Sequence, residues 1–240
     1  MRVVISQSML FPWVGLLEQM HLADVFVHYD DVQFSKGSFV NRVQIKTPVG
    51  PRWMTTPTHN LHLGQCISEV KLAPASRWVD QCLTLLSTNL AGAPYATDAI
   101  ALAESVFASG HCHAGGLARA SLLALGNYFG LTEDKRFVDV GTLGIGGSSS
   151  QRVLDIVLRL GGDEYITGHG ASRYLDHALF GRAGVEVSYM RYRLKPYPQL
   201  HGEFTPYVSG LDLVANCGRE GRQYIGSSTV PWKEFIHESA

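Results

Sequence analysis

The sequence lacks the features that mark several broad classes of protein. No apolar run among its 240 residues approaches the roughly 18 residues that a membrane-spanning helix needs. Its 20 basic and 21 acidic residues leave a net charge of −1, so no excess of positive charge favours nucleic acid or an anionic lipid surface. An apolar run begins at Arg2, which leaves no room for a signal peptide. We therefore expect a cytoplasmic protein that binds neither nucleic acid nor a membrane.

Cysteine is scarce, and no established pattern of metal ligands is present. The four cysteines have no Cys-x-x-Cys spacing, which favours reduced thiols in a cytoplasmic protein. The stretches 59–62 and 111–113 contain histidines, but neither is paired with a second cluster at zinc spacing. No Gly-x-Ser-x-Gly sequence marks a nucleophilic serine. The sequence therefore predicts neither a metal site nor a catalytic triad.

Apolar, strand-like runs alternate with helical patterns along much of the chain. Strands are expected at 2–6, 24–29, 136–140, 164–167 and 185–189, with helices at 16–20, 151–160 and 172–180. Strands that alternate with helices at this spacing are typical of a parallel sheet. The predicted fold is therefore α/β, a mainly parallel Rossmann-like open sheet with helices on both faces.

Two excursions interrupt this alternation. A β-hairpin is expected from 39–45 and 52–55, which are joined by a Pro/Gly turn, and a further strand is expected at 67–72. Residues 76–131 are rich in Ala and Leu and predict helices. The chain is accordingly predicted to be a single α/β domain, 1–240, with residues 76–131 as a helical insertion or cap.

Within the helical segment, a helix is expected to begin at Ser76, a break to fall near Ser109 and Gly110, and a second helix to end at Gly130. The last forty residues are aromatic and irregular, with one short helix near 211–216. We expect them to wrap the edge of the sheet.

Polar side chains gather just after the second predicted strand. Ligands of open α/β sheets bind at the carboxyl ends of strands, which places a site here. Adjacent acids can hold Mg²⁺, orient an amine or simply end a strand, and basic groups can neutralise phosphate or carboxylate. Catalytic roles are predicted for Asp30, Asp31 and Lys36. The site residues of this segment are Asp30, Asp31, Gln33, Lys36, Asn41 and Arg42.

A glycine- and serine-rich loop, 144–150, leads into a later predicted helix. Free N–H groups and the helix dipole favour an anion at such a position. Arg152 lies in the first turn, where the dipole disfavours a cation unless something negative is bound. Ser149, Ser150 and Arg152 are therefore predicted to hold a phosphate. The loop matches neither the Walker A nor the Gly-x-Gly-x-x-Gly pattern, and a capped, flexible connection is the alternative.

The loop after the next strand reads Gly168-His169-Gly170-Ala171-Ser172, with Tyr174 one turn on. Its glycines permit close backbone approach, and His169 is predicted to act as a general acid/base or as a donor to phosphate. A surface or capping histidine is the alternative. Near the C-terminus, His201 and Phe204 belong to a segment that can stack on or hydrogen-bond a sugar, or seal the sheet edge.

Three stretches resemble the WbqC-like protein family: "ISQSMLFPWVGLLEQMHLADVFVHYDDVQFSKGSFVNRVQIK", "SSSQRVLDIVLRLGGDEYITGHGASRYLD" and "PYPQLHGEFTPYVSGLDLVANCG". The resemblance implies a cytoplasmic bacterial protein that is often encoded with genes for O-antigen, capsule or other surface-glycan and modified-sugar pathways. The family-like positions are Gln7, Phe11, Pro12, Trp13, Asp30, Asp31, Gln33, Lys36, Asn41, Arg42, Ser150, Arg152, Gly168, Gly170, Tyr174 and Phe204.

A fainter likeness exists to pantothenate synthetase, which adenylates an acid and hands it to an amine. "VQF" at 32–34 is similar to a strand end in that family. The early histidines of its nucleotide loop are replaced here by 11–15, "FPWVG", and its late Ser-Ser-Arg segment has an out-of-order counterpart at 149–152. This likeness brings ATP with Mg²⁺ into consideration as a co-substrate.

The resemblance and the residues together predict an enzyme of surface-glycan or modified-sugar biosynthesis. It would transfer or ligate an acyl or aminoacyl group onto the amino group of a nucleotide-linked sugar or a similar small amine. A non-catalytic ligand-binding protein or scaffold of the same pathway is one alternative, and an ATP-independent group transferase is another. Ser172, Tyr174 and His201 complete the predicted binding residues, and the oligomeric state is left open.

Overall fold

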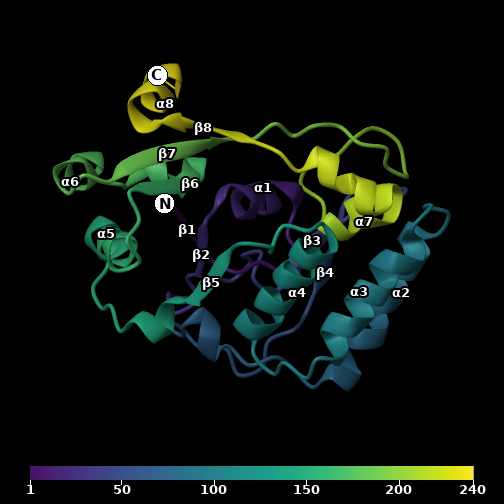
Figure 1. Ribbon diagram of the computed structural model, residues 1–240. Helices are drawn as coiled ribbons and strands as arrows, with labels where there is room; N and C mark the ends of the chain where they lie inside the picture. The colour runs from purple at the N-terminus through teal and green to yellow at the C-terminus, as the bar shows by residue number, and fades with distance from the viewer. Residues whose placement is uncertain (240) are drawn as a thin grey trace.

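The computed structural model describes residues 1–239, and Figure 1 shows them wound around one sheet. Six strands have the order β5-β2-β1-β6-β7-β8. The first five are parallel, and β8 runs antiparallel to β7 at one edge. This confirms the predicted α/β fold with a mainly parallel sheet. The strand bounds are β1 Arg2–Ser6, β2 Val25–His28, β5 Arg136–Asp139, β6 Glu164–Thr167, β7 Glu186–Arg191 and β8 Ser228–Pro231.

The strands bury both faces because each face has its own helical layer. Val3 and Ile5 of β1 belong to one hydrophobic cluster, and Val4 between them belongs to the other. The first cluster is completed by α5 (Ser149–Arg159) and α6 (His177–Arg182), and the second by α1 (Val14–Leu22) and α4 (Ala114–Tyr128). Figure 1 shows the two pairs of helices on opposite sides of the sheet.

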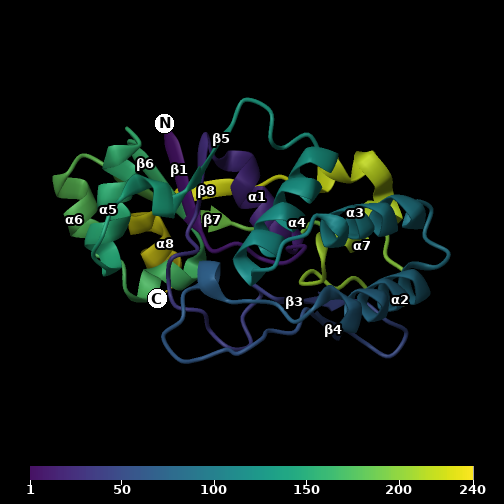
Figure 2. The same cartoon turned by 90° about the horizontal axis from the view of Figure 1, so that it is seen from below.

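The hairpin and the helical segment both lie between β2 and β5. β3 (Arg42–Ile45) pairs antiparallel with β4 (Arg52–Thr55) in a separate sheet, which confirms the predicted hairpin. α2 (Val79–Leu90) packs beside α3 (Ala96–Ala108), and α3 packs against α7 (Gly210–Cys217). Figure 2 shows α2 and α3 at the end of the molecule that lies farthest from α5 and α6.

Several local predictions about this helical segment hold. The break near Ser109 separates α3 from α4, and Gly130 follows α4 with a left-handed φ of 62°. The short helix expected near 211–216 is α7. Among residues 1–239, no helix combines the length and apolar character that crossing a membrane requires.

The strand predicted at 67–72 is wrong. Residues Ile67–Glu69 form a 3₁₀ turn, and the fully buried Ile67 and Val70 are spaced three apart, so they face the same way. They pack beneath α4 rather than alternating between two faces. The polar residues between these two apolar ones lie on the turn, and the sequence therefore shows apolar and polar residues in succession without forming a strand.

Two predicted helix starts fall too early. The helix expected from residue 172 begins at His177, where the Asp176 side chain accepts a hydrogen bond from the Leu179 N–H at 3.0 Å. A 3₁₀ turn, His169–Arg173, precedes it. Likewise Ala75–Arg77 form a 3₁₀ turn before α2.

The C-terminal stretch carries two elements that the sequence did not indicate, β8 and α8 (Trp232–Ser239). β8 ends in Pro231, which has no N–H to donate and is tolerated on an edge strand. The strand and helix cover the β7 side of the sheet, as expected of a segment that wraps the edge. The last residue of the predicted domain, Ala240, lies outside the described residues.

At Gly210, α7 packs closely against the loop that follows β1 and against α4. A Cβ atom there would lie 2.8 Å from the Pro12 carbonyl oxygen and 2.9 Å from Leu125 Cδ1. Replacing Gly210 with Ala should therefore lower the free energy of unfolding by about 1–3 kcal/mol, the usual cost of overpacking. Gly181→Ala is the matched control, because nothing lies within 4 Å of that helical position; it should be neutral or stabilise by up to about 1 kcal/mol. Urea denaturation measures both, and equal effects would contradict the close approach.

Candidate functional site

The topology opens a crevice between β1 and β6. From β1 the chain builds outward through β2 and β5, and then returns to place β6 on the other side of β1. Loops that follow β1 and β6 therefore leave in different directions, and ligands of open α/β sheets bind at such a switch point. A cavity of about 450 Å³ lies there. Its lining includes Gln7, Gln19, Tyr29, Thr167, Gly168, Gly170 and Tyr174.

A second hollow, of about 400 Å³, continues this cavity toward α5. Tyr29 and Tyr174 line both, so the two form one depression along the carboxyl edge of the sheet, which we call the switch-point crevice. The α5 half adds Asp31, Gln33, Gly147, Ser148, Ser149 and Arg152. Residues from the segment after β2, from the loop before α5 and from the loop after β6 therefore line one depression.

Arg152 has an acidic partner inside the crevice. Its Nη2 donates to Asp31 Oδ2 at 2.5 Å, and its Nε donates to the Ile145 carbonyl at 3.1 Å. The guanidinium carbon lies 5.1 Å from the centre of the Tyr29 ring. Only 8% of Arg152 is exposed. The sequence analysis explained Arg152 by a bound anion. In the structure, the negative charge beside Arg152 comes from Asp31.

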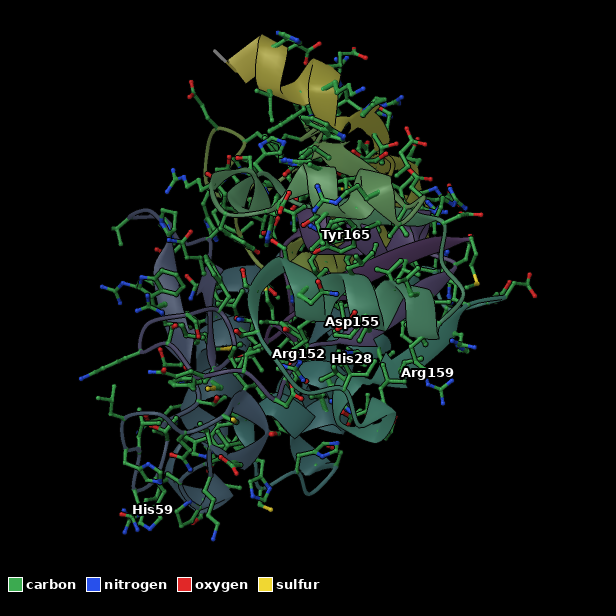
Figure 3. All side chains as sticks on the ribbon, turned by 90° about the vertical axis from the view of Figure 1, so that its left-hand side faces the viewer. His28, His59, Arg152, Asp155, Arg159 and Tyr165 are labelled. Atoms are coloured by element: carbon green, nitrogen blue, oxygen red, sulfur yellow. The ribbon has the colours of Figure 1, made fainter. Side chains whose placement is uncertain are left out.

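The first turn of α5 is left without a side-chain cap. Ser148 is in the capping position but makes no capping hydrogen bond, and Ser149 has a left-handed φ of 58°. Ser150 lies 5% exposed, accepts from the Asp176 N–H at 2.9 Å and donates to the Tyr174 carbonyl at 3.4 Å. Ser150 therefore ties the two loops together, while Ser149 and the helix start face the crevice. Figure 3 shows Arg152 and Arg159 toward opposite ends of α5.

Asp30, the neighbour of Asp31, is turned into the protein. It is 1% exposed and accepts from the Ser8 N–H at 2.9 Å, the Ser8 hydroxyl at 2.8 Å and Arg119 Nη2 at 3.0 Å. Arg119 on α4 also donates to Asp139 at the end of β5, at 2.8 Å. Asp30 therefore positions the loops that follow β1 and β2. Its predicted catalytic role stays a prediction.

Sequence reasoning did not find Ser8, His28 or Arg119. The Ser8 hydroxyl lies 3.1 Å from His28 Nδ1, and the His28 ring stacks on Phe137. The signal in the sequence was Arg119 itself, a charged residue within an Ala- and Leu-rich helix. A partly buried charge on such a helix favours an acidic partner, although the sequence does not say which.

Lys36, Asn41 and Arg42 lie apart from the crevice. They line a separate hollow of about 390 Å³ beside the β3–β4 hairpin. Gln33 lines the crevice and Phe34 lines this hollow, so the chain between them separates the two. The group of polar residues that the sequence predicted as one site is therefore divided.

The ring of His169 lies against the far edge of the sheet. Its Nε2 lies 2.6 Å from the Met190 carbonyl oxygen, and the ring packs against Tyr192 and Phe235. The Ser172 hydroxyl donates back to the His169 carbonyl at 2.8 Å. Gly168 and Gly170 on either side do line the crevice. A ligand in the crevice can therefore approach the backbone at these two glycines closely. The His169 imidazole does not line the crevice.

The remaining predicted residues support the framework. Phe11 is fully buried and its N–H donates to the Ser121 hydroxyl, while the Pro12 carbonyl accepts from the Gly210 N–H. Trp13 contacts the rings of Tyr192 and Tyr207. His201 Nε2 lies 2.8 Å from the Asn89 carbonyl oxygen, and Phe204 packs on Tyr197, both on the α2 and α7 side of the molecule. None of these five lines the crevice.

The sequence signature of the WbqC-like protein family matches residues 7–224. The chain belongs to the WbqC-like protein family. A similar protein is the uncharacterized Rv1507c of Mycobacterium tuberculosis, 30% identical over 227 residues, which are 93% of this chain and 97% of that one. No solved structure matches the chain. For this WbqC-like protein, chemistry must be inferred from the crevice itself.

Two adjacent acids do not form a joint carboxylate site in this WbqC-like protein, because Asp30 faces Ser8 and Arg119 while Asp31 faces Arg152. Within residues 1–239, no three His, Cys, Asp or Glu side chains are grouped so that they could hold a metal ion. Figure 3 shows His59, from one of the histidine stretches, far from Arg152 and His28.

Burial shifts the pKa values of two side chains of the WbqC-like protein in opposite directions. Burial, with the charge of Arg119 adding to it, lowers the pKa of His28 from 6.5 to about 4. Burial raises the pKa of Glu18 on α1 from 4.5 to about 7, against weaker opposing effects of Ser227 and Arg193. Both side chains are almost fully buried, 2% and 1% exposed. Each group is therefore favoured in its neutral form by the fold.

These shifts predict opposite dependences of stability on pH. Below pH 6.5 the unfolded chain protonates His28 before the folded chain does, so His28 removes stability as the pH falls toward 4. Above pH 4.5 the unfolded chain ionises Glu18 first, so Glu18 removes stability as the pH rises toward 7. Both groups act between pH 4.5 and pH 6.5. Across this range each changes the free energy of unfolding by about 2–3 kcal/mol, at about 1.4 kcal/mol per pH unit.

Urea denaturation of wild type, His28→Gln and Glu18→Gln from pH 4.5 to 6.5 tests this. Relative to wild type, His28→Gln should gain stability toward acid pH, and Glu18→Gln should gain it toward neutral pH. The comparison with wild type removes contributions that all three proteins share. Parallel pH profiles for the three would show that burial does not shift these groups.

Proposed function

We propose that this WbqC-like protein is an enzyme of surface-glycan or modified-sugar biosynthesis that transfers or ligates an acyl or aminoacyl group onto the amino group of a nucleotide-linked sugar or a similar small amine. One observation carries the proposal: the switch-point crevice joins an uncapped helix start that carries Arg152 to a half rich in amide and hydroxyl groups. A nucleotide-linked sugar has the same two parts.

The α5 half suits the phosphate groups. Uncapped N–H groups at the first turn and the buried charge of Arg152 attract an anion. Tyr29 and Tyr174 line both halves and offer ring faces to a base or sugar between them. In the other half, Gln7 and Thr167 offer hydrogen bonds to sugar hydroxyl groups. Tyr174 is 62% exposed, so it stands at the mouth of the crevice.

Acyl transfer to an amine needs a group that accepts the proton lost when the nitrogen attacks the carbonyl carbon. Asp31 is the carboxylate among the residues that line the crevice, and we assign it this role. Arg152, bound to Asp31 Oδ2, holds that carboxylate in place and can stabilise the negative charge that develops on the acyl oxygen as the amine attacks. That charge passes to the leaving group when its bond to the carbonyl carbon breaks.

ATP with Mg²⁺ belongs to the proposal as a co-substrate that would activate a free carboxylic acid. Asp31 Oδ1 is buried and has no hydrogen-bond partner among the described residues, so it is the carboxylate oxygen that this crevice offers to a cation. The predicted roles of Lys36 and His169 in catalysis would require a substrate that extends beyond the crevice.

A non-catalytic binding protein is the second candidate, and one observation favours it. The lining of the crevice contains no His, Cys or Lys, and its carboxylate is already paired with Arg152. Such a lining can hold a ligand without turnover. An ATP-independent transferase would use the same residues with an activated acyl donor.

Replacing Arg152 with Ala should weaken binding of UDP, used as a nucleoside diphosphate probe, by about tenfold to a hundredfold, the usual range for a lost charge-assisted hydrogen bond. Isothermal titration calorimetry measures the affinity. Arg159→Ala is the matched control, because it removes the same charge from the exposed last turn of the same helix. Equal affinity of the Arg152 variant and the control would remove the phosphate assignment.

Turnover separates the enzyme from the binding protein. Purified protein is incubated with ATP, a panel of amino acids and nucleotide-linked amino sugars, and mass spectrometry follows AMP, ADP and an acylated sugar. We expect an acylated product, reduced about a hundredfold or more in Asp31→Asn by loss of the proton acceptor. UDP binding without any product from the panel would favour the binding protein, and an acylated sugar from an activated donor without AMP or ADP would favour the ATP-independent transferase.

A further inference from the structure

The hollow beside the β3–β4 hairpin is separate from the switch-point crevice. Gln33 and Phe34 are neighbours in an extended stretch, and successive residues of extended chain point to opposite sides. Gln33 lines the switch-point crevice while Phe34 lines the hairpin hollow, so the two depressions lie back to back across this stretch. No residue lines both.

Charge in the hairpin hollow is unbalanced. Lys36 and Arg42 line it, and no Asp or Glu does. Among residues 1–239 neither side chain forms an ion pair, in contrast to Arg119 and Arg152. A cavity with two cations that lack an acidic partner among residues 1–239 attracts an anion.

The guanidinium of Arg42 is held in place. It lies 4.0 Å from the centre of the Trp53 ring, and its Nη2 donates to the Gly37 carbonyl. Its Nη1 has no hydrogen-bond partner among the described residues, so this edge of the group is free to donate. A guanidinium fixed by stacking loses little conformational entropy when it binds an anion.

The hollow also has an apolar wall. Phe34, Pro57 and Leu61 line it, and Leu61 is 37% exposed at the rim. No helix begins at the hollow, so it lacks the row of free N–H groups that suits phosphate. A planar carboxylate matches a guanidinium edge, and an attached hydrocarbon chain matches the wall.

We infer that the hairpin hollow binds the carboxylate of a small organic acid, with Arg42 and Lys36 on the carboxylate and the hydrocarbon part against Phe34 and Pro57. This site does not depend on the proposed function, since it shares no lining residue with the switch-point crevice. Thr58 in the lining adds a hydroxyl that can donate to the same carboxylate.

Calorimetric or NMR titration of the full chain with the straight-chain monocarboxylates from acetate to hexanoate tests the inference. We expect saturable binding that tightens roughly threefold to fourfold for each added methylene that reaches the wall. Lys36→Ala and Arg42→Lys should each weaken hexanoate binding about tenfold or more, by loss of a charge and of the guanidinium edge respectively.

Arg52→Ala is the matched control, because Arg52 is an exposed arginine of the same hairpin outside the hollow. Its affinity for hexanoate should equal that of wild type, as should that of Arg152→Ala. Lys36 is exposed and has no side-chain hydrogen bond among the described residues, so Lys36→Ala decides the matter if Arg42→Lys folds poorly.

The inference is overturned if no acid of the series binds saturably, if Lys36→Ala binds hexanoate as wild type does, or if inorganic phosphate binds there more tightly than hexanoate. Loss of UDP binding in Arg152→Ala with hexanoate binding intact would show two independent sites. Failure of UDP to bind at all would leave the hairpin site standing.

Discussion

The buried carboxylate of Asp30 holds the carboxyl edge of the sheet in one arrangement. Taking a charge out of water is costly, and it persists here because Ser8 and Arg119 provide three hydrogen bonds to it. Arg119 extends the link to Asp139, so the loops after β1, β2 and β5 are joined to α4. The next residue, Asp31, is thereby directed into the switch-point crevice, and the geometry of the crevice follows from this constraint.

The two candidate binding regions differ in how their charges are balanced. In the crevice, Arg152 is paired with Asp31, so an incoming phosphate must share or displace an existing partner. In the hairpin hollow, Arg42 and Lys36 have no acidic partner among the described residues. Burial is consistent with the difference, because the more buried arginine, Arg152, is the paired one. A paired arginine suits a site where charge develops or moves, and an unpaired one suits simple capture of an anion.

The irregular C-terminal segment supports the framework around the crevice and is not part of its lining. Lys46 is 4% exposed, and its ammonium group donates to Gln199 Oε1 at 2.9 Å and to the Gly202 carbonyl at 3.2 Å. This fixes the path of the segment along the hairpin. Nearer β7, the Tyr192 hydroxyl accepts from Gln19 Nε2 at 2.7 Å beside Gly168. The family match over residues 7–224 spans residues that shape the crevice as well as residues that line it.

Local patterns in the sequence determined the five parallel strands of the sheet, the hairpin and most of the helices, and they predicted the edge of the sheet at which we propose the site. Apolar periodicity and glycine positions are properties of a few neighbouring residues, so they survive without knowledge of the fold. Only the tertiary structure decided that Asp31 is the partner of Arg152, that Asp30 is turned away toward Arg119, and that the polar run after β2 divides between two hollows. Contacts between residues about a hundred positions apart depend on how the loops are packed, and no local pattern encodes that packing.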